Sequence, residues 1–396
     1  MVCAVSDMDE PGELVVGDAS PTGRVNEWLA AEDREAIVRP DNRIAYFKYF
    51  ANVALYLASL FLALSDLGMA ANIAGAIVNG VALAVFFIIG HDAVHNAFFE
   101  KRSENEILGR IAFGLCWHSV TLWKVVHNIN HHSRTNYRRV DDVWRPMSYA
   151  EYKRLPLWRR ALERIYRSPF GHLIYYELDF LFPKLILPLN SQTRPFWRRH
   201  IADSVFVVGF GLTALTGVVL IGGWLAPSSG ILARLMFGAV IPFVIWNFLA
   251  SLTIYVQHTH PDVHWFDDES RWSFYRGQIE GTVDVLVKFD VIPLYAEVLR
   301  HNAHHSYPKI PVYKLPAAQK HLVARYGRAV TQWSLGVAAL LDVHRRCKLY
   351  DYEAQCWTDF SGNPTSGSWF DLHTEPGNPF RDRIKGDANA EIGSAA

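Results

Sequence analysis

The sequence predicts an all-α integral membrane protein with four transmembrane helices in two hairpins and a helical cap on the cytosolic side. Three observations predict this fold class. Half of the 396 residues are hydrophobic and 20% are charged, whereas soluble domains carry roughly 25% charged residues. The hydrophobic residues gather in four blocks of nearly membrane-spanning length. The long segment between the second and third blocks is strongly basic.

The first 43 residues are expected to form an acidic N-terminal tail. This tail contains ten Asp and Glu residues and four arginines. No basic segment precedes an apolar core, so the pattern is not that of a secretory signal peptide. Residues 26–37 could form a short amphipathic helix at the membrane surface, with Trp28 as an interfacial anchor.

Four apolar blocks follow this tail. The predicted spans are Tyr49–Leu64, Ile73–Gly90, Val205–Leu225 and Leu235–Val256. They are apolar on every face, which favours a bilayer over the core of a soluble protein. The connections 65–72 and 226–234 are short and contain one basic residue, Arg234. The spans are therefore expected to form two hairpins.

The segment 101–199 sets the expected orientation. It carries 18 Lys and Arg residues and 8 Asp and Glu residues, a net charge of +10. The positive-inside rule places this loop, and with it both tails, in the cytosol. A membrane domain is assigned to residues 44–357 and a flexible C-terminal tail to residues 358–396. The apolar stretch Phe170–Leu189 contains interrupting charges and Pro183, so we expect an interfacial helix rather than a fifth span.

Eleven of the 17 histidines lie in four tight clusters. They are His91 and His95; His127, His131 and His132; His258, His260 and His264; and His301, His304 and His305. The first cluster follows the second span and the third follows the fourth span. All four clusters should therefore meet just above one membrane surface. Imidazole is a ligand for iron, zinc and copper, and one structural zinc takes only four ligands, so the count suggests two metal ions.

These histidines resemble the three histidine boxes of the membrane fatty acid desaturase family. The family patterns H-x(3,4)-H, H-x(2,3)-H-H and (H/Q)-x-x-H-H correspond here to HDAVH, HNINHH and HNAHH. The segments DDVWRP, YVQHTHPDVHWFDDESRWSFYRGQIEGTVD and HNAHHSYPKIPVYKL also resemble acyl-lipid desaturases. The resemblance covers roughly residues 45–330. One departure is Asn96, which stands where plant members often carry a third histidine of the first box.

The resemblance implies a histidine-ligated di-iron centre (Fe2+/Fe3+) with no catalytic residue beyond the metal ligands. The implied ligands are His91, His95, His127, His131, His132, His258, His301, His304 and His305. Residues that could orient these ligands are Asp92, Asp141, Asp142, His260 and Asp284. The alternative for the carboxylates is that they are solvated surface groups.

The resemblance also implies the reaction and its partners. A lipid-linked fatty acyl chain would be desaturated with O2, at a site in contact with membrane lipids. The sequence has no HPGG haem signature and no CxxC pair, so electrons would come from a separate ferredoxin or cytochrome with its reductase. The 39 basic residues balance 39 acidic residues, which argues against a nucleic-acid partner.

Two other functions stay open at this point. The same scaffold could serve a hydroxylase, ketolase or other oxygenase acting on an acyl chain, a carotenoid or another lipid. A receptor or metal sensor without turnover is the third hypothesis. The expected location is an integral membrane protein whose active site faces the cytosol. The lack of a KDEL-type C-terminal signal favours a bacterial inner membrane over the endoplasmic reticulum.

Overall fold

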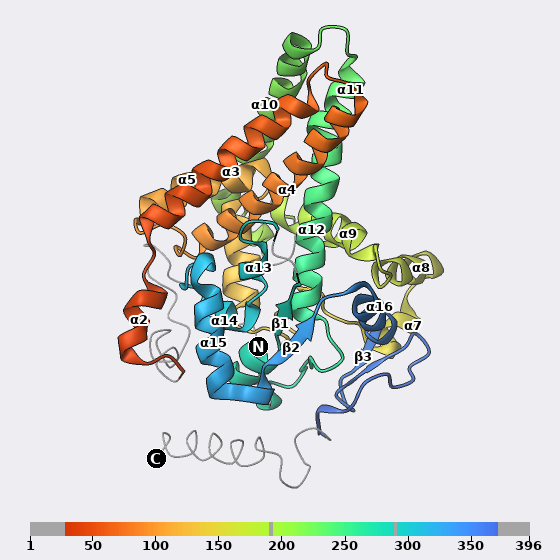
Figure 1. Ribbon diagram of the computed structural model, residues 1–396. Helices are drawn as coiled ribbons and strands as arrows, with labels where there is room; N and C mark the ends of the chain where they lie inside the picture. Colours follow the sequence, from red (N-terminus) through yellow and green to blue (C-terminus); the bar gives the residue numbers. More distant parts are fainter. Residues whose placement is uncertain (1–27, 190–192, 289–290, 371–396) are drawn as a thin grey trace.

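Four long apolar helices dominate the structure, a computed structural model that describes residues 28–189, 193–288 and 291–370. They are α3 (Asn42–Ala63), α4 (Met69–Val94), α10 (Trp197–Leu225) and a continuous helix formed by α11 (Ile231–Leu235), η4 (Met236–Val240) and α12 (Ile241–His258). Within the described residues, these four are long and apolar enough to cross a bilayer. The prediction of four membrane helices is confirmed at this level, and Figure 1 shows α3, α10 and α12 extending away from the cap.

Helices α3 and α4 pack closely along their length. A β-carbon on Gly75 would lie 2.3 Å from the backbone nitrogen of Ala63, so only glycine permits this approach. The side-chain amide of Asn79 donates to the Tyr56 carbonyl oxygen at 2.8 Å and to Ser59 Oγ at 3.0 Å. Small residues and interhelical hydrogen bonds are the usual means by which apolar helices associate in a bilayer.

Gly75→Ala should therefore destabilise the α3–α4 pair. The added methyl group meets rigid backbone, so we expect a loss of about 1–3 kcal/mol, as for other overpacked sites. Thermal unfolding in micelles measures this loss. The control is Gly217→Ala on α10, where no described atom beyond the adjacent backbone of the same helix lies within 4 Å of the new β-carbon. Its stability should be unchanged or slightly raised, because alanine favours a helix, and equal losses in both variants would contradict the packing argument.

Short helices build the cap around the ends of α4 and α12. They are α2 (Ala31–Val38), α5 (Arg102–Leu115), α6 (Val120–Trp123), η1 (Lys124–His131), α7 (Tyr149–Arg154), α8 (Leu157–Tyr166), α9 (Gly171–Tyr175), η2 (Tyr176–Ile186), η3 (Arg194–Phe196), η5 (Glu269–Arg271), η6 (Arg276–Glu280), α13 (Tyr295–Val298), α14 (His301–Ser306), η7 (Val312–Lys314), α15 (Leu315–Tyr326), η8 (Gly327–Ala329) and α16 (Val337–Arg346). Segments η1, η2, η4 and η6 are π-helical.

The cap also contains two small sheets, so the all-α prediction is wrong in this detail. Strand β1 (Val283–Leu286) pairs in parallel with β2 (Thr331–Ser334). Strand β3 (Leu349–Asp351) pairs antiparallel with β4 (Cys356–Thr358). Apolar runs as short as VDVL are too brief for periodicity to separate a strand from a helical turn.

Three local expectations are refined by the structure. Helix α2 begins at Ala31, and Trp28 is buried against the core, so it is not an exposed interfacial anchor. The stretch from residue 171 to 186 is helical, as α9 and η2, and is not among the four candidate spans of the described chain. Folded structure continues past residue 357, because Trp369 packs edge-on against Phe266. The rest of the expected C-terminal tail, residues 371–396, lies outside the described residues.

Candidate metal centre

The nine histidines that were expected as ligands lie together in two buried groups. The five-histidine group consists of His91, His95, His127, His132 and His304. The four-histidine group consists of His131, His258, His301 and His305. Within each group, one ring nitrogen of every histidine lies within 4.8 Å of the corresponding nitrogens of the others. The structure thus brings all nine to one place from distant parts of the chain.

Two histidines of the five-histidine group come from the end of a membrane helix. His91 lies in the last turn of α4, and His95 caps that helix. Their spacing of four residues places both rings on one helix face. On the neighbouring helix, His258 is the last residue of α12 and belongs to the four-histidine group. The cap end of this helix pair therefore supplies histidines to both groups.

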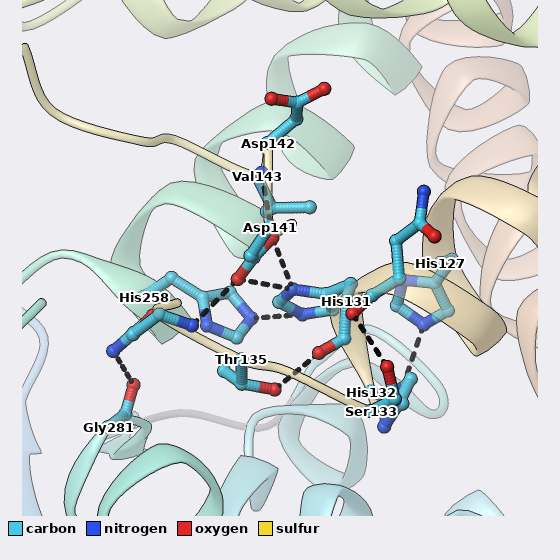
Figure 2. A network of polar contacts seen from close by, with 12 residues as sticks. His127, His131, His132, Ser133, Thr135, Asp141, Asp142, Val143, His258 and Gly281 are labelled. Carbon is cyan, nitrogen blue, oxygen red and sulfur yellow. Dashed lines mark hydrogen bonds and ion pairs between the residues drawn. The ribbon is translucent and has the colours of Figure 1, made fainter. Parts of the chain in front are cut away.

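A π-helix distributes the three histidines of HNINHH between the groups. In η1 the backbone N–H of His132 donates to the carbonyl oxygen of His127 at 2.9 Å, a separation of five residues. The wider turn brings His127 and His132 into the five-histidine group, whereas His131 points into the other group (Figure 2). An ordinary α-helix would instead have placed His127 and His131 on one face.

Helix α14 is also shared between the groups. His301 and His305, one helical turn apart, join the four-histidine group, and His304 joins the five-histidine group. Both histidine-rich segments, η1 and α14, therefore contribute to both groups. This sharing holds the two groups side by side.

The geometry of the ring nitrogens fits bound metal ions. The Nε2 atoms of His91 and His127 are 2.8 Å apart, and those of His258 and His301 are also 2.8 Å apart. Two nitrogens that bind one ion at right angles, each at about 2.1 Å, lie about 3.0 Å from each other. The buried Nε2 atoms of His95, His304 and His305 have no hydrogen-bond partner in the described part of the chain. Metal coordination would satisfy these atoms.

Burial keeps these imidazoles in the form that binds metals. Desolvation lowers the pKa of His95, His127 and His132 well below the ordinary value, and neighbouring imidazoles lower it further. The rings are therefore neutral at physiological pH. Neutral imidazole is a preferred ligand of iron, zinc and copper. The buried groups are thus compatible with a metal site.

Of the five residues expected to orient the histidines, Asp141 contacts one of the nine directly. Both carboxylate oxygens lie 3.0 Å from Nδ1 of His131 (Figure 2). The same carboxylate accepts from the backbone N–H groups of Asn136 at 2.8 Å and Val143 at 2.9 Å. These contacts hold Nδ1 of His131 as the protonated nitrogen and leave Nε2 facing the four-histidine group.

The other four expected orienting residues have different partners. Asp92 accepts from the backbone N–H of Val312 at 3.1 Å, and Asp142 binds Lys184 at 3.0 Å. Asp284 binds Arg300 at 2.8 Å and Gln332 at 2.9 Å, and His260 lies 3.6 Å from Asp262. Asp284 thus holds the side chain of Arg300, the residue that precedes His301. Asp92 ties the end of α4 to the chain after α14.

Gln278 was not singled out from the sequence, although it contacts the site directly. Its Oε1 accepts from Nδ1 of His305 at 2.7 Å and from Thr135 Oγ1 at 2.9 Å. Its amide nitrogen donates to the carbonyl oxygen of His132 at 2.7 Å. Gln278 therefore links the segment HNINHH to the segment HNAHH by hydrogen bonds. Its only signal in the sequence is its place in the segment RGQIEGTVD, because a neutral amide does not stand out as an acceptor in the way that a carboxylate does.

Gln278→Leu should weaken metal binding about 10- to 100-fold, the usual effect of removing such a partner. His305 would lose its acceptor, and the carbonyl of His132 would lose a donor. Metal content after dialysis against a weak chelator measures the change. The matched control is Gln332→Leu, since Gln332 bonds Asp284 and no histidine. Wild-type metal retention in Gln278→Leu would contradict the assigned role.

A narrow apolar cavity reaches the two histidine groups. It is walled by residues such as Ala84, Phe87, Phe180, Ala250 and Ile254. Its histidine lining comes from both groups and consists of His91, His127, His131, His258 and His301.

Two polar side chains in the cavity wall are bonded to the protein itself. Thr253 Oγ1 lies 2.9 Å from Tyr295 Oη, and the Gln257 amide donates to the Val298 carbonyl oxygen at 2.9 Å. The lining is accordingly mostly apolar, apart from the imidazoles and the Trp123 indole, whose N–H has no hydrogen-bond partner among the described residues. Such a cavity suits a hydrocarbon chain.

The four candidate membrane helices and the paired histidine groups are those expected of a membrane-associated protein with a metal site beside an apolar cavity. Comparison with protein families matches residues 68–335 to the family described as fatty acid desaturase. The chain therefore belongs to the fatty acid desaturase family. Membership confirms the predicted resemblance to this family.

Three curated relatives illustrate the similarity. The chain is 28% identical over 287 residues to a chloroplastic omega-6 fatty acid desaturase of Glycine max, covering 69% of this chain and 61% of the relative. It is 28% identical over 283 residues to an sn-1 oleoyl-lipid 12-desaturase of Synechocystis sp., covering 69% and 74%. It is 26% identical over 245 residues to an sn-1 acyl-lipid omega-3 desaturase (ferredoxin) of Synechocystis sp., covering 61% and 64%. The match thus spans less than two thirds of the first and third relatives.

Proposed function

We propose that the protein introduces a double bond into the acyl chain of a membrane lipid, at two iron ions held by the nine histidines. The observation that carries this proposal is the apolar cavity lined by imidazoles of both groups. The five-histidine group would hold one ion and the four-histidine group the other. Iron, when bound, supplies the activation of O2 and the oxidising power needed to attack an unactivated C–H bond.

The balance of the reaction defines the partners. A –CH2–CH2– unit, O2, two electrons and two protons give –CH=CH– and two molecules of water. The electrons require a separate donor, because the sequence has no CxxC pair. The name of the Synechocystis omega-3 relative includes ferredoxin, which supports a ferredoxin as the donor here.

The residues of the chain would position the substrate and exclude water. Phe87, Trp123 and Phe180 surround the cavity beside the histidines. An acyl chain held among them would present its C–H bonds to the space between the two histidine groups. The closely packed wall of the cavity would keep water away from the reacting C–H bonds, which limits side reactions.

Lipid mass spectrometry tests the reaction. A host that expresses the full chain should contain a lipid two mass units lighter than its parent, absent from a host with the empty vector. The position of the new double bond would define the regiochemistry. A product sixteen mass units heavier would overturn desaturation in favour of an oxygenase of the same family.

We also propose that the spans form two hairpins with the cap in the cytosol, in the inner membrane of a bacterium. The net charge of +10 on segment 101–199 supports this orientation. A reporter enzyme fused after Pro227, between α10 and α11, should read as extracytosolic. A control fusion after Arg154, on α7 in the cap, should read as cytosolic. The same reading from both fusions would contradict the proposed topology.

A further inference from the structure

A second cavity lies on the outer side of the cap, where α5, the end of α4, η1 and α10 meet. Its volume is about 400 Å³. The polar lining includes Arg110, Lys124 and Glu106, and the apolar lining includes Ile107, Ile111 and Phe206. None of the residues that line it belongs to the two histidine groups. The cavity is therefore separate from the proposed active site.

The charges around this cavity are not fully compensated. Glu106 bonds Arg102 at 2.8 Å, and Arg110 forms an ion pair with Asp203. The ammonium group of Lys124 forms no ion pair or hydrogen bond with the described residues. Burial lowers the pKa of Lys124, and the like charges of Arg102 and Arg110 oppose the stabilising effect of Glu106. A half-buried cation at this position would be stabilised by an anion from outside the chain.

The cavity lies at the level where a membrane helix ends. Val94, the last residue of α4, lines it, and Phe206 reaches it from the apolar helix α10. On α5, Ile107 is 62% exposed and Ile111 is 36% exposed, although both are apolar. Exposed isoleucines next to basic residues are typical of a surface that contacts lipid at the membrane boundary.

We propose that this cavity binds the phosphate-bearing head group of an anionic membrane lipid. Lys124 would donate to the phosphate and Arg110 would add positive charge, while Ile107, Ile111 and Phe206 would contact the start of the acyl chains. A free inorganic anion would leave this apolar wall without a partner. The inference does not depend on the proposed reaction, because it concerns binding alone.

The position of Lys124 links this lipid site to the metal centre. Lys124 is the first residue of η1, and the same π-helix carries His127 and His131. A lipid phosphate bound at Lys124 would thus restrain the helix that supplies ligands to both histidine groups. The bound lipid would act as a structural ligand of the cap.

Lipid binding to the purified full-length chain in neutral micelles tests the proposal. Native mass spectrometry would measure the binding of dimyristoyl phosphatidylglycerol and of dimyristoyl phosphatidylcholine. We expect wild type to prefer the anionic lipid, and Lys124→Met to reduce that preference about fivefold, the effect of one lysine near an anionic surface. Lys124→Arg should retain the preference. The matched control is Lys320→Met on α15, an exposed lysine outside the cavity, which should behave as wild type.

If Lys124→Met does not fold, two further measurements on the wild-type protein still test the proposal. Raising the ionic strength should weaken phosphatidylglycerol binding to wild type and leave phosphatidylcholine binding unchanged. Inorganic phosphate at the same concentration should not displace the lipid. Equal binding of the two lipids by wild type, or an unchanged preference in Lys124→Met, would overturn the proposal. Displacement by inorganic phosphate would assign the site to a soluble anion and would also overturn it.

Discussion

His304→Ala is expected to abolish double-bond formation while the protein still inserts into the membrane. His304 belongs to the five-histidine group, its side chain is buried, and its Nε2 atom has no hydrogen-bond partner among the described residues. Removing the ring takes away a proposed ligand and leaves helix α14 otherwise unchanged. Two measurements check this result: the lighter lipid in expressing cells, and iron per chain in purified protein. Iron content should fall together with product.

The control for this variant is His321→Ala. His321 lies on α15, is partly exposed, and faces Asp33 at 3.8 Å rather than another histidine. Product and iron content should stay at the wild-type level. If His304→Ala formed as much product as wild type, His304 would not be a ligand, whatever the iron content of the variant.

Asp141→Asn should lower both iron affinity and turnover by about 10- to 100-fold. The two carboxylate oxygens of Asp141 accept from His131 and from two backbone N–H groups. An amide has only one oxygen, so its NH2 group would face at least one of these donors. His131 would then lose its fixed orientation, or a buried N–H group would lose its acceptor. Iron titration and single-turnover product measurements check this expectation.

The neighbouring residue provides a matched control. Asp142→Asn makes the same chemical change one residue later, but Asp142 binds Lys184 at the surface of the cap and no histidine. We expect iron affinity within about twofold of wild type, because a partly exposed ion pair contributes little. Equal losses in the two variants would indicate a general effect of charge rather than orientation of His131.

The sequence predicted the spans and the meeting of the nine histidines because both depend on local patterns. Apolar blocks of sufficient length specify membrane helices, and their short connections place alternate ends at the same surface. His91 lies in the last turn of α4 and His258 is the last residue of α12, so the positions of the helix ends place both. The proposed ligand set was therefore accessible before any tertiary contact was known.

Other features depend on contacts between distant residues and could not be predicted. The π-helical turn at His127–His132 changes which histidines share a group, and HNINHH itself does not distinguish a π-helix from an α-helix. Gln278 meets His305 across 27 residues, and its neutral amide gave no charge signal. The pairing of β1 with β2 likewise joins segments 48 residues apart in the chain.

The division of η1 and α14 between the two histidine groups has a consequence for assembly. Each of these segments contributes histidines to both groups, so on the proposed assignment fixing it around one ion would also order ligands for the other. Binding of the first ion would then carry most of the entropy cost of ordering η1 and α14. The second ion would bind to imidazoles that are already largely in position. Loading of the centre would accordingly be cooperative, and chains with one ion would be scarce compared with empty and fully loaded chains.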